Sequence, residues 1–151
     1  MNLMSETITW ILRNKSGGIW SIAPDATVYD ALALMAEREV GALMVLSAGK
    51  QLVGIISERD YARKIILQGR SSRDTTVQEI MTGDMITVTP EDTIDEAMRI
   101  MTHHHIRHLP VLDQSKLVGV ISIGDLVNAI ITEQARMIDH LHTYIGANYP
   151  T

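Results

Sequence analysis

The chain of 151 residues contains no cysteine, which excludes disulfide bonds, thiolate catalysis and cysteine-based zinc sites. It has no run of lysine or arginine and a formal net charge of -5, so it lacks the basic surface that nonspecific nucleic-acid binding requires. No apolar stretch approaches the roughly 18 residues of a membrane span. The first ten residues, MNLMSETITW, lack the basic start and apolar core of a secretory signal. We therefore expect a cytoplasmic globular protein that binds neither membranes nor nucleic acid.

Two signatures of catalysis are also missing. Ser122 follows Val120 at the position where a serine hydrolase has glycine, so the nucleophile-elbow pattern fails, and the chain has no glycine-rich phosphate loop. A cluster of histidines, His103, His104, His105 and His108, is the remaining candidate for chemistry. The i, i+4 spacing of His104 and His108 suits a metal, but no carboxylate or cysteine stands close by. The simpler interpretation is a solvated helix end, whose negative dipole favours imidazoles.

What the chain does contain is an internal repeat. IAPDATVYDALALMAEREVGALMVL, which contains Pro24, aligns with VTPEDTIDEAMRIMTHHHIRHLPVL, which contains Pro90, at an offset of 66 residues. One extra residue near Gly49 changes the offset to 65, after which Gly54-Ile-Ile-Ser-Glu-Arg-Asp60 coincides with Gly119-Val-Ile-Ser-Ile-Gly-Asp125. A unit of about 60 residues is used twice, and because one such unit buries little surface alone, we expect the two to pack together.

Each unit predicts the element order β-α-β-β-α, an α+β fold. A short extended piece (Trp20 to Ile22; Ile86 to Val88) precedes the proline, and apolar residues then recur at helical spacing, with Met35 and Met101 in the core. Two apolar runs joined by a polar turn predict a hairpin in each unit, and a helix follows Ser57 and Ser122. The predicted hairpin strands are Ala42 to Leu46 with Leu52 to Ile56, and Leu109 to Leu112 with Leu117 to Ile121.

The doubled Gly-apolar-apolar-Ser-x-x-Asp segment has two interpretations. A serine that ends a strand commonly caps the following helix, and an acid three residues later sits in the positive first turn. The second copy favours a ligand role for Asp60 and Asp125, since a carboxylate has two acceptor oxygens and a ribose offers two adjacent hydroxyl donors. Both interpretations can hold for Ser57 and Ser122.

These motifs resemble the CBS domain, named after cystathionine β-synthase, as a free-standing tandem pair or Bateman module. The resemblance rests on the Pro-acid-x-Thr-apolar entry, on RHLPVLD from Arg107 to Asp113, and on the doubled Ser-x-x-Asp segment. It implies two repeats packed sheet to sheet about a pseudo-two-fold axis, at 8–70 and 76–133, with a helical extension at 134–151. It also implies a regulatory sensor and not an enzyme, with AMP, ATP, NAD(H) or S-adenosylmethionine bound in the cleft between the repeats. A small metal-dependent enzyme using His103–His108 is the alternative.

The resemblance extends the candidate site beyond the two motifs. Adenine would lie in an apolar slot, and the cations nearest the motifs could meet phosphates. AMP is the first candidate, with ATP or NAD(H) as alternatives. The implied binding residues are Ile22, Gly41, Ala42, Ser57, Arg59, Asp60, Thr87, Val88, Arg107, His108, Ser122 and Asp125.

The two copies differ in charge. Arg107-His108 corresponds to Gly41-Ala42, and Arg59 corresponds to Gly124; Met44 also stands where the family usually has proline, which Pro110 retains. We therefore expect two unequal nucleotide sites. The site that contains Asp60 should prefer a ligand with more phosphate groups.

The C-terminal segment continues the helical pattern to Gly146, with Gln134 interrupting it. This stripe either packs on its own domain or contacts a second copy or another partner. We expect a homodimer that signals to a separate, unknown protein. The apolar stripe comprises Val127, Ile130, Ile131, Ile138, Leu141 and Ile145.

Overall fold

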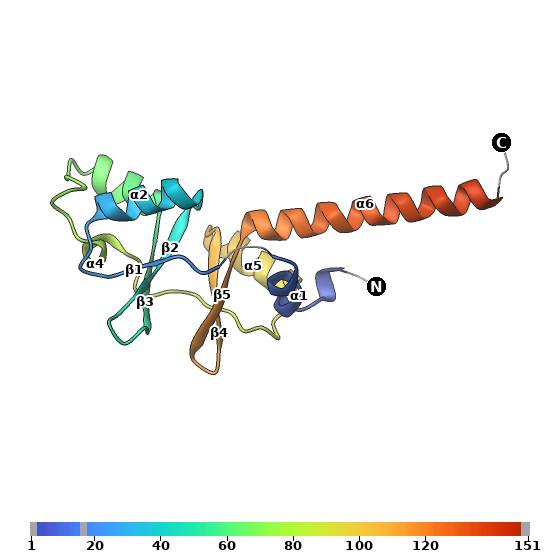
Figure 1. The fold of residues 1–151 in the computed structure, drawn as a ribbon, viewed down its shortest axis with the longest axis horizontal. Helices are drawn as coiled ribbons and strands as arrows, with labels where there is room; N and C mark the ends of the chain where they lie inside the picture. The colour runs from blue at the N-terminus through green and yellow to red at the C-terminus, as the bar shows by residue number, and fades with distance from the viewer. Residues whose placement is uncertain (1–2, 16–17, 149–151) are drawn as a thin grey trace. The chain divides into compact units, whose positions relative to one another are not determined.

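The computed structural model describes residues 3–15 and 18–148, with side chains up to residue 143. The chain divides into two compact units, and each is built from separate stretches of sequence. One comprises 18–87 and 110–120, and the other comprises 3–15, 88–109 and 121–148 (Figure 1). We call them the central unit and the terminal unit.

The central unit is a three-stranded sheet with helices. Its strands β1 (Ser21–Ile22), β2 (Ala42–Leu46) and β3 (Leu52–Ser57) lie in the order β1-β2-β3, with β1 parallel to β2 and β2 antiparallel to β3. Helix α2 (Val28–Arg38) begins where the Thr27 hydroxyl accepts the Asp30 N–H. One turn, α3 (Glu58–Tyr61), continues as a π-helix (Ala62–Ile66), and α4 (Val77–Ile80) follows. Residues 110–120 also belong to this unit.

The core of the central unit lies between α2 and the sheet. Val28, Ala31 and Met35 form the buried face of α2 and pack with residues of β2 and β3. The predicted helical spacing and the core role of Met35 are therefore confirmed. The buried cluster comprises Val28, Ala31, Met35, Leu43, Val45, Ile56, Ile65, Val77 and Ile80.

The terminal unit joins both ends of the chain. A 3-10 turn (Leu3–Ser5) and helix α1 (Ile8–Asn14) come from the N-terminus, and α5 (Ile94–His104) and α6 (Ile123–Asn148) come from the second repeat. The N–H of Ile8 donates to the Asp92 carbonyl at 2.8 Å, and that of Thr9 to the Pro90 carbonyl at 3.1 Å. Ile8 and Ile11 are buried, as are Ile94, Ala97 and Met101 on α5. The N-terminal helix is therefore part of this core.

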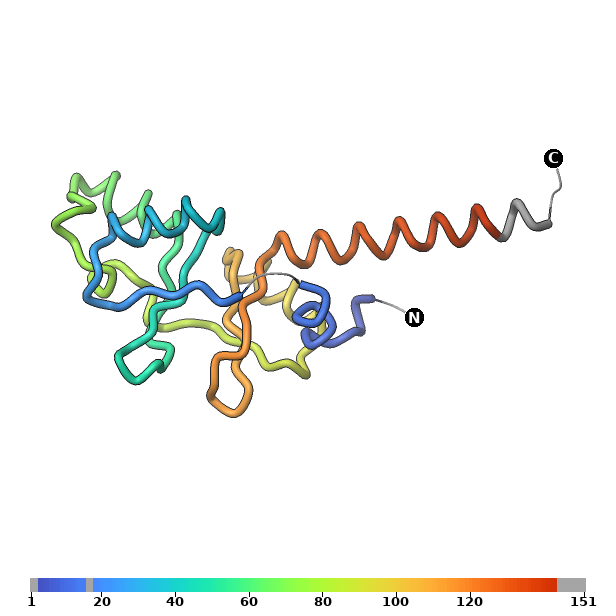
Figure 2. Tube along the Cα trace, in the orientation of Figure 1, coloured from blue at the N-terminus to red at the C-terminus, as the bar shows by residue number. Residues whose placement is uncertain are grey.

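Strands β4 (His108–Asp113) and β5 (Lys116–Ser122) form the predicted second hairpin. Helix α6 follows directly and runs for 26 residues as one continuous helix (Figure 2). Within residues 3–15 and 18–148, no helix is both long enough and apolar enough to cross a membrane.

The α+β class is confirmed, but one predicted strand is wrong. Ile86 and Thr87 belong to no strand, and Val88 forms a single bridge residue, so the second repeat lacks its first strand. The N–H of Thr89 donates to the Asp92 carboxylate at 2.8 Å. This contact organises the turn before α5, and the described sheet of β4 and β5 has no third strand.

Candidate functional site

Ser57 is the last residue of β3 and the N-cap of α3, where Ser57 and Asp60 hydrogen-bond to each other. The Ser57 N–H and hydroxyl donate to Asp60 Oδ2 at 2.9 and 3.1 Å, and the Asp60 N–H donates to the Ser57 hydroxyl at 3.3 Å. Such a capping box satisfies backbone donors that a helix start leaves free. The capping interpretation of this motif is thus observed directly.

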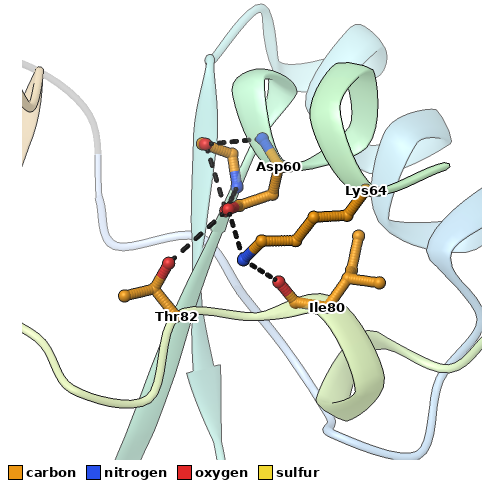
Figure 3. A network of polar contacts seen from close by, with 5 residues as sticks. Asp60, Lys64, Ile80 and Thr82 are labelled. Atoms are coloured by element: carbon orange, nitrogen blue, oxygen red, sulfur yellow. Dashed lines mark hydrogen bonds and ion pairs between the residues drawn. The ribbon is translucent and has the colours of Figure 1, made fainter. Parts of the chain in front are cut away.

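The other carboxylate oxygen of Asp60, Oδ1, contacts side chains from two further segments (Figure 3). Oδ1 lies 3.1 Å from Lys64 Nζ and 3.5 Å from Thr82 Oγ1. Lys64 also donates to the carbonyl of Ile80 at 2.8 Å. The Asp60 side chain is only 13% exposed. Asp60 therefore links the end of β3, the π-helix and the segment after α4, and both its oxygens are engaged.

Asp125 repeats the cap at the start of α6. The Ser122 N–H donates to Asp125 Oδ2 at 2.8 Å, and the Asp125 N–H donates to the Ser122 hydroxyl at 3.1 Å. Lys15, just after α1, reaches the same Oδ2 at 2.8 Å, and the side chains of Lys15 and Asp125 are 28% and 21% exposed. Among the contacts described for Asp125, none involves Oδ1, which leaves this oxygen as an acceptor for a ligand.

Each carboxylate thus has a lysine, but the two lysines come from unrelated positions. Lys64 is four residues after Asp60, and the corresponding position after Asp125 is Ala129. Lys15 supplies the second charge from the opposite end of the chain. Sequence reasoning missed both lysines. The i, i+4 spacing of Asp60 and Lys64 was a usable signal, whereas the Lys15–Asp125 pair had none. These two lysines add to the cations predicted from the sequence.

Backbone hydrogen bonds hold two further predicted residues beside the motifs. The Glu58 N–H donates to the Gly41 carbonyl at 3.0 Å, and the Ile123 N–H donates to the Arg107 carbonyl at 2.9 Å. These bonds occupy corresponding places in the two repeats. Ala42 pairs with Ser57 in the sheet. The structure therefore brings Gly41, Ala42, Ser57 and Asp60 together in one unit, and Arg107, His108, Ser122 and Asp125 in the other.

Three of the remaining predicted residues, Ile22, Thr87 and Val88, lie outside the two cap segments, whereas Arg59 lies inside the first, between Ser57 and Asp60. Ile22 is half-buried on β1 and pairs with Val45. Thr87 is exposed and Val88 is 2% exposed, so Val88 serves the core of the terminal unit. Arg59 is half-buried in α3. A ligand role for these residues stays a prediction.

His108, at the start of β4, interacts electrostatically with Asp125. Burial lowers the pKa of His108 below its usual value; the charge of Asp125 opposes this, and those of Lys15 and Arg107 reinforce it. His108 is therefore predominantly neutral near pH 7, and can act as a hydrogen-bonding group there.

The other histidines of the cluster lie at the end of α5. His103, His104 and His105 are exposed, and the rings of His103 and His104 meet edge to face at 4.8 Å. His105 ends the helix in the left-handed conformation. In the part of the chain that the structure describes, no group of three or more acidic, histidine or cysteine residues is arranged to hold a metal ion.

Comparison with known proteins agrees with the fold. A family model described as "CBS domain" matches residues 16–67 and 77–132. The CBS domain-containing protein CBSX3, mitochondrial, of Arabidopsis thaliana is 45% identical over 153 residues, which cover 96% of this chain and 74% of that protein. A CBS-domain protein of Burkholderia ambifaria, whose structure is solved, is 50% identical with a TM-score of 0.81, over 85% of this chain and 96% of that one.

A more distant solved structure shares the fold. The CBS domain pair of MJ0100, in complex with 5-methylthioadenosine and S-adenosyl-L-methionine, is 23% identical with a TM-score of 0.74, over 84% of this chain and 97% of that one. The internal repeat, the family match over both copies and the similarity along nearly the whole chain lead to one conclusion. The chain belongs to the CBS-domain family and carries two CBS domains.

Proposed function

We propose that this protein is a non-enzymatic sensor of adenosine compounds that binds its ligand at the two Ser-x-x-Asp caps. AMP is the first candidate, and ATP and NAD(H) are the alternatives. The ligand would bias the shape or assembly of a homodimer and thereby alter a separate partner protein. A ligand can do this only to the extent that it binds two states of the protein unequally.

The observation that carries this proposal is the duplicated, half-buried carboxylate beside a lysine. Asp60 and Asp125 are both held by the backbone of their own cap, so their orientation is fixed before a ligand arrives. A fixed carboxylate can accept both hydroxyls of a ribose, and a neighbouring ammonium group favours phosphate. Polar groups that are already oriented bind with a smaller loss of conformational entropy.

The contacts also support two sites of unequal affinity. At Asp125, Oδ1 accepts none of the bonds described for that side chain, so a ribose could bind without breaking them. At Asp60, a ribose must replace the contact with Thr82 or that with Lys64. The Thr82 contact at 3.5 Å is long for a hydroxyl donor and should break first. We expect the Asp125 site to bind the ribose more tightly.

The test is calorimetric titration of the purified chain with adenosine, AMP, ATP, NAD(H) and S-adenosylmethionine, alongside thermal melting with the same compounds. A true ligand at about a hundred times its Kd should stabilise the fold by about 2.7 kcal/mol. The MJ0100 complex supports the choice of ligands, because that CBS pair holds two adenosine compounds. If no adenosine compound binds at millimolar concentration, the proposal fails.

Substitutions at the two carboxylates separate their roles. Asp125→Ala should weaken binding by about 1–3 kcal/mol, since it leaves two ribose hydroxyls without acceptors, and 2′-deoxy-AMP should lose a similar amount with the parent protein. Asp60→Ala should have the smaller effect of the two. Asp113→Ala, at an exposed aspartate outside both caps, is the matched control. Equal affinity in all three variants would remove both carboxylates from the site.

The alternative function is a metal-dependent enzyme that uses the histidines His103–His108. The histidines at the end of α5 are exposed, and no arrangement of them among the described residues suits a metal. Stabilisation by Zn²⁺ but not by nucleotides would reverse the order of the two proposals.

A further inference from the structure

Helix α6 continues well past the helices that support it. Its first turns pack against α1 and α5, where Leu126 is fully buried and Ala129 is 7% exposed. From Gln134 to Thr143 every side chain is exposed. A helical stretch without tertiary contacts is marginally stable in water, because packing of an apolar face supplies most helix stability. This part of α6 therefore needs a partner.

The exposed face carries the spacing of a coiled coil. Val127, Ile131, Gln134, Ile138 and Leu141 follow each other at intervals of four, three, four and three residues. Ile131, Ile138 and Leu141 are 58%, 55% and 56% exposed. In heptad terms, isoleucines occupy the a positions, and Val127, Gln134 and Leu141 occupy the d positions. Ile145 continues the spacing in sequence, but its side chain lies outside the described residues. β-Branched residues at a with leucine at d, the combination present at Ile138 and Leu141, favour two parallel strands.

The charges on α6 lie away from this face. Glu133, Arg136 and Asp139 occupy the outer positions c, f and b, and Glu133 pairs with Arg136 on the same helix at 3.4 Å. The positions that flank the face hold Ala135, Met137 and His142 instead of acidic or strongly basic residues. Two copies of this helix could therefore meet without bringing like charges of these residues together.

Gln134 identifies the partner and its orientation. In a parallel, in-register pair, each d residue faces the same residue of the other chain, so Gln134 would meet Gln134. Two amides can donate to and accept from each other. Against an apolar partner or in an antiparallel pair, Gln134 would be buried against isoleucine or leucine without a hydrogen bond, which is costly.

We propose that residues 127–141 of α6 form a parallel, two-stranded coiled coil with a second copy of this chain. The proposal refines the homodimer of the proposed function and is independent of nucleotide binding.

Sedimentation of the full chain tests whether the exposed face of α6 forms the dimer contact. Ile131→Asp/Ile138→Asp should raise the dimer dissociation constant by at least about a hundredfold, because it buries four charges in the paired helices. Thr132→Asp/Thr143→Asp adds the same charge to the other face and should leave the constant unchanged. Circular dichroism checks that each variant keeps its helix, and AMP titration checks that the CBS sites are intact.

Cross-linking tests whether the two helices are parallel. Because the chain has no native cysteine, only an introduced cysteine can form a disulfide. Gln134→Cys should form an intermolecular disulfide under mild oxidation, since paired d positions can approach within the Cα separation of about 4.4–6.8 Å that a disulfide allows. Arg136→Cys, on the outer face, should not.

The outcomes separate the two proposals. If the double Asp variant stays as tightly dimeric as the parent, the coiled coil is wrong, while the homodimer stands on another surface. If it dissociates but Gln134→Cys does not cross-link, the parallel register is wrong. A monomeric parent chain at micromolar concentration would overturn both the homodimer and the coiled coil.

Discussion

At the scale of single residues, His108 should make stability depend on pH. Because burial lowers its pKa in the folded state, the unfolded chain takes up a proton first as the pH falls. The free energy of unfolding should therefore decrease once the pH drops through the unfolded value of about 6.5, and should gain nothing from His108 at higher pH. Urea unfolding of the parent chain between pH 5 and 8 measures this slope.

His108→Asn is the variant to compare, since it keeps a polar side chain that cannot titrate. The difference in stability between the two proteins should shift with pH below neutrality and be constant above it. Asp125, Lys15 and Arg107 act on His108 in the same unit, so the comparison should use one ionic strength. A difference that stays constant across the whole range would show that the folded chain protonates His108 as readily as the unfolded chain.

The sequence predicted the residues of each cap but not what surrounds them. Ser57 with Asp60 and Ser122 with Asp125 could be found because caps use residues close in sequence. The Lys15–Asp125 pair joins residues 110 positions apart, and no local pattern reports such a contact. The predicted set of charges around Asp125 therefore did not include Lys15.

At the scale of elements, Gly54 shows why β3 begins its motif with glycine. A Cβ atom at Gly54 would lie 2.5 Å from Met81 Sδ and 3.1 Å from the Thr82 carbonyl oxygen. The segment after α4 therefore packs directly on β3, and Ile55 exchanges two backbone hydrogen bonds with Thr82 at 3.0 and 2.9 Å. Gly54→Ala should destabilise the fold by about 1–3 kcal/mol through overpacking, as measured by denaturant unfolding.

Gly49→Ala is the matched control in the turn between β2 and β3. A Cβ atom there would meet only the Ser47 hydroxyl, at 4.0 Å. The left-handed residue of this turn is Lys50, with φ of 61°, and not Gly49. The control should change stability by less than about 0.5 kcal/mol. Equal losses in the two variants would indicate a general cost of replacing glycine and not a contact with Met81.

Helices and strands could be predicted where buried apolar residues recur at a regular spacing. The buried residues of α2 and α5 recur at helical spacing, so both helices were identified, and the hairpin strands followed from their apolar runs. The expected strand from Ile86 to Val88 failed because a short apolar stretch does not show whether a neighbour will pair with it. The change from α3 to a π-helix at Ala62 also leaves no mark in periodicity.

At the scale of the whole molecule, the terminal unit depends on the N-terminal helix. Ile8 is fully buried there, so Ile8→Ala should cost about 2–5 kcal/mol. Hydrogen exchange should show the loss of protection in α5 and the first turns of α6 more than in α2 and β2. Ile66→Ala, at a side chain 57% exposed, should leave both units protected. A uniform loss of protection throughout the chain after Ile8→Ala would mean that the two units unfold as one.

The division of the chain also sets an order of events during synthesis. Most of the central unit lies in the uninterrupted stretch 18–87, and can begin to fold as soon as that stretch leaves the ribosome. Helix α1 precedes that stretch in the chain, but Asp125, the partner of Lys15, follows 110 residues later. At about 5–20 residues per second the wait is about 5–20 seconds. Ile8 and Ile11 have no core to enter until α5 and the first turns of α6 follow. We therefore expect the nascent chain to expose an apolar helix that chaperones can bind until this core forms.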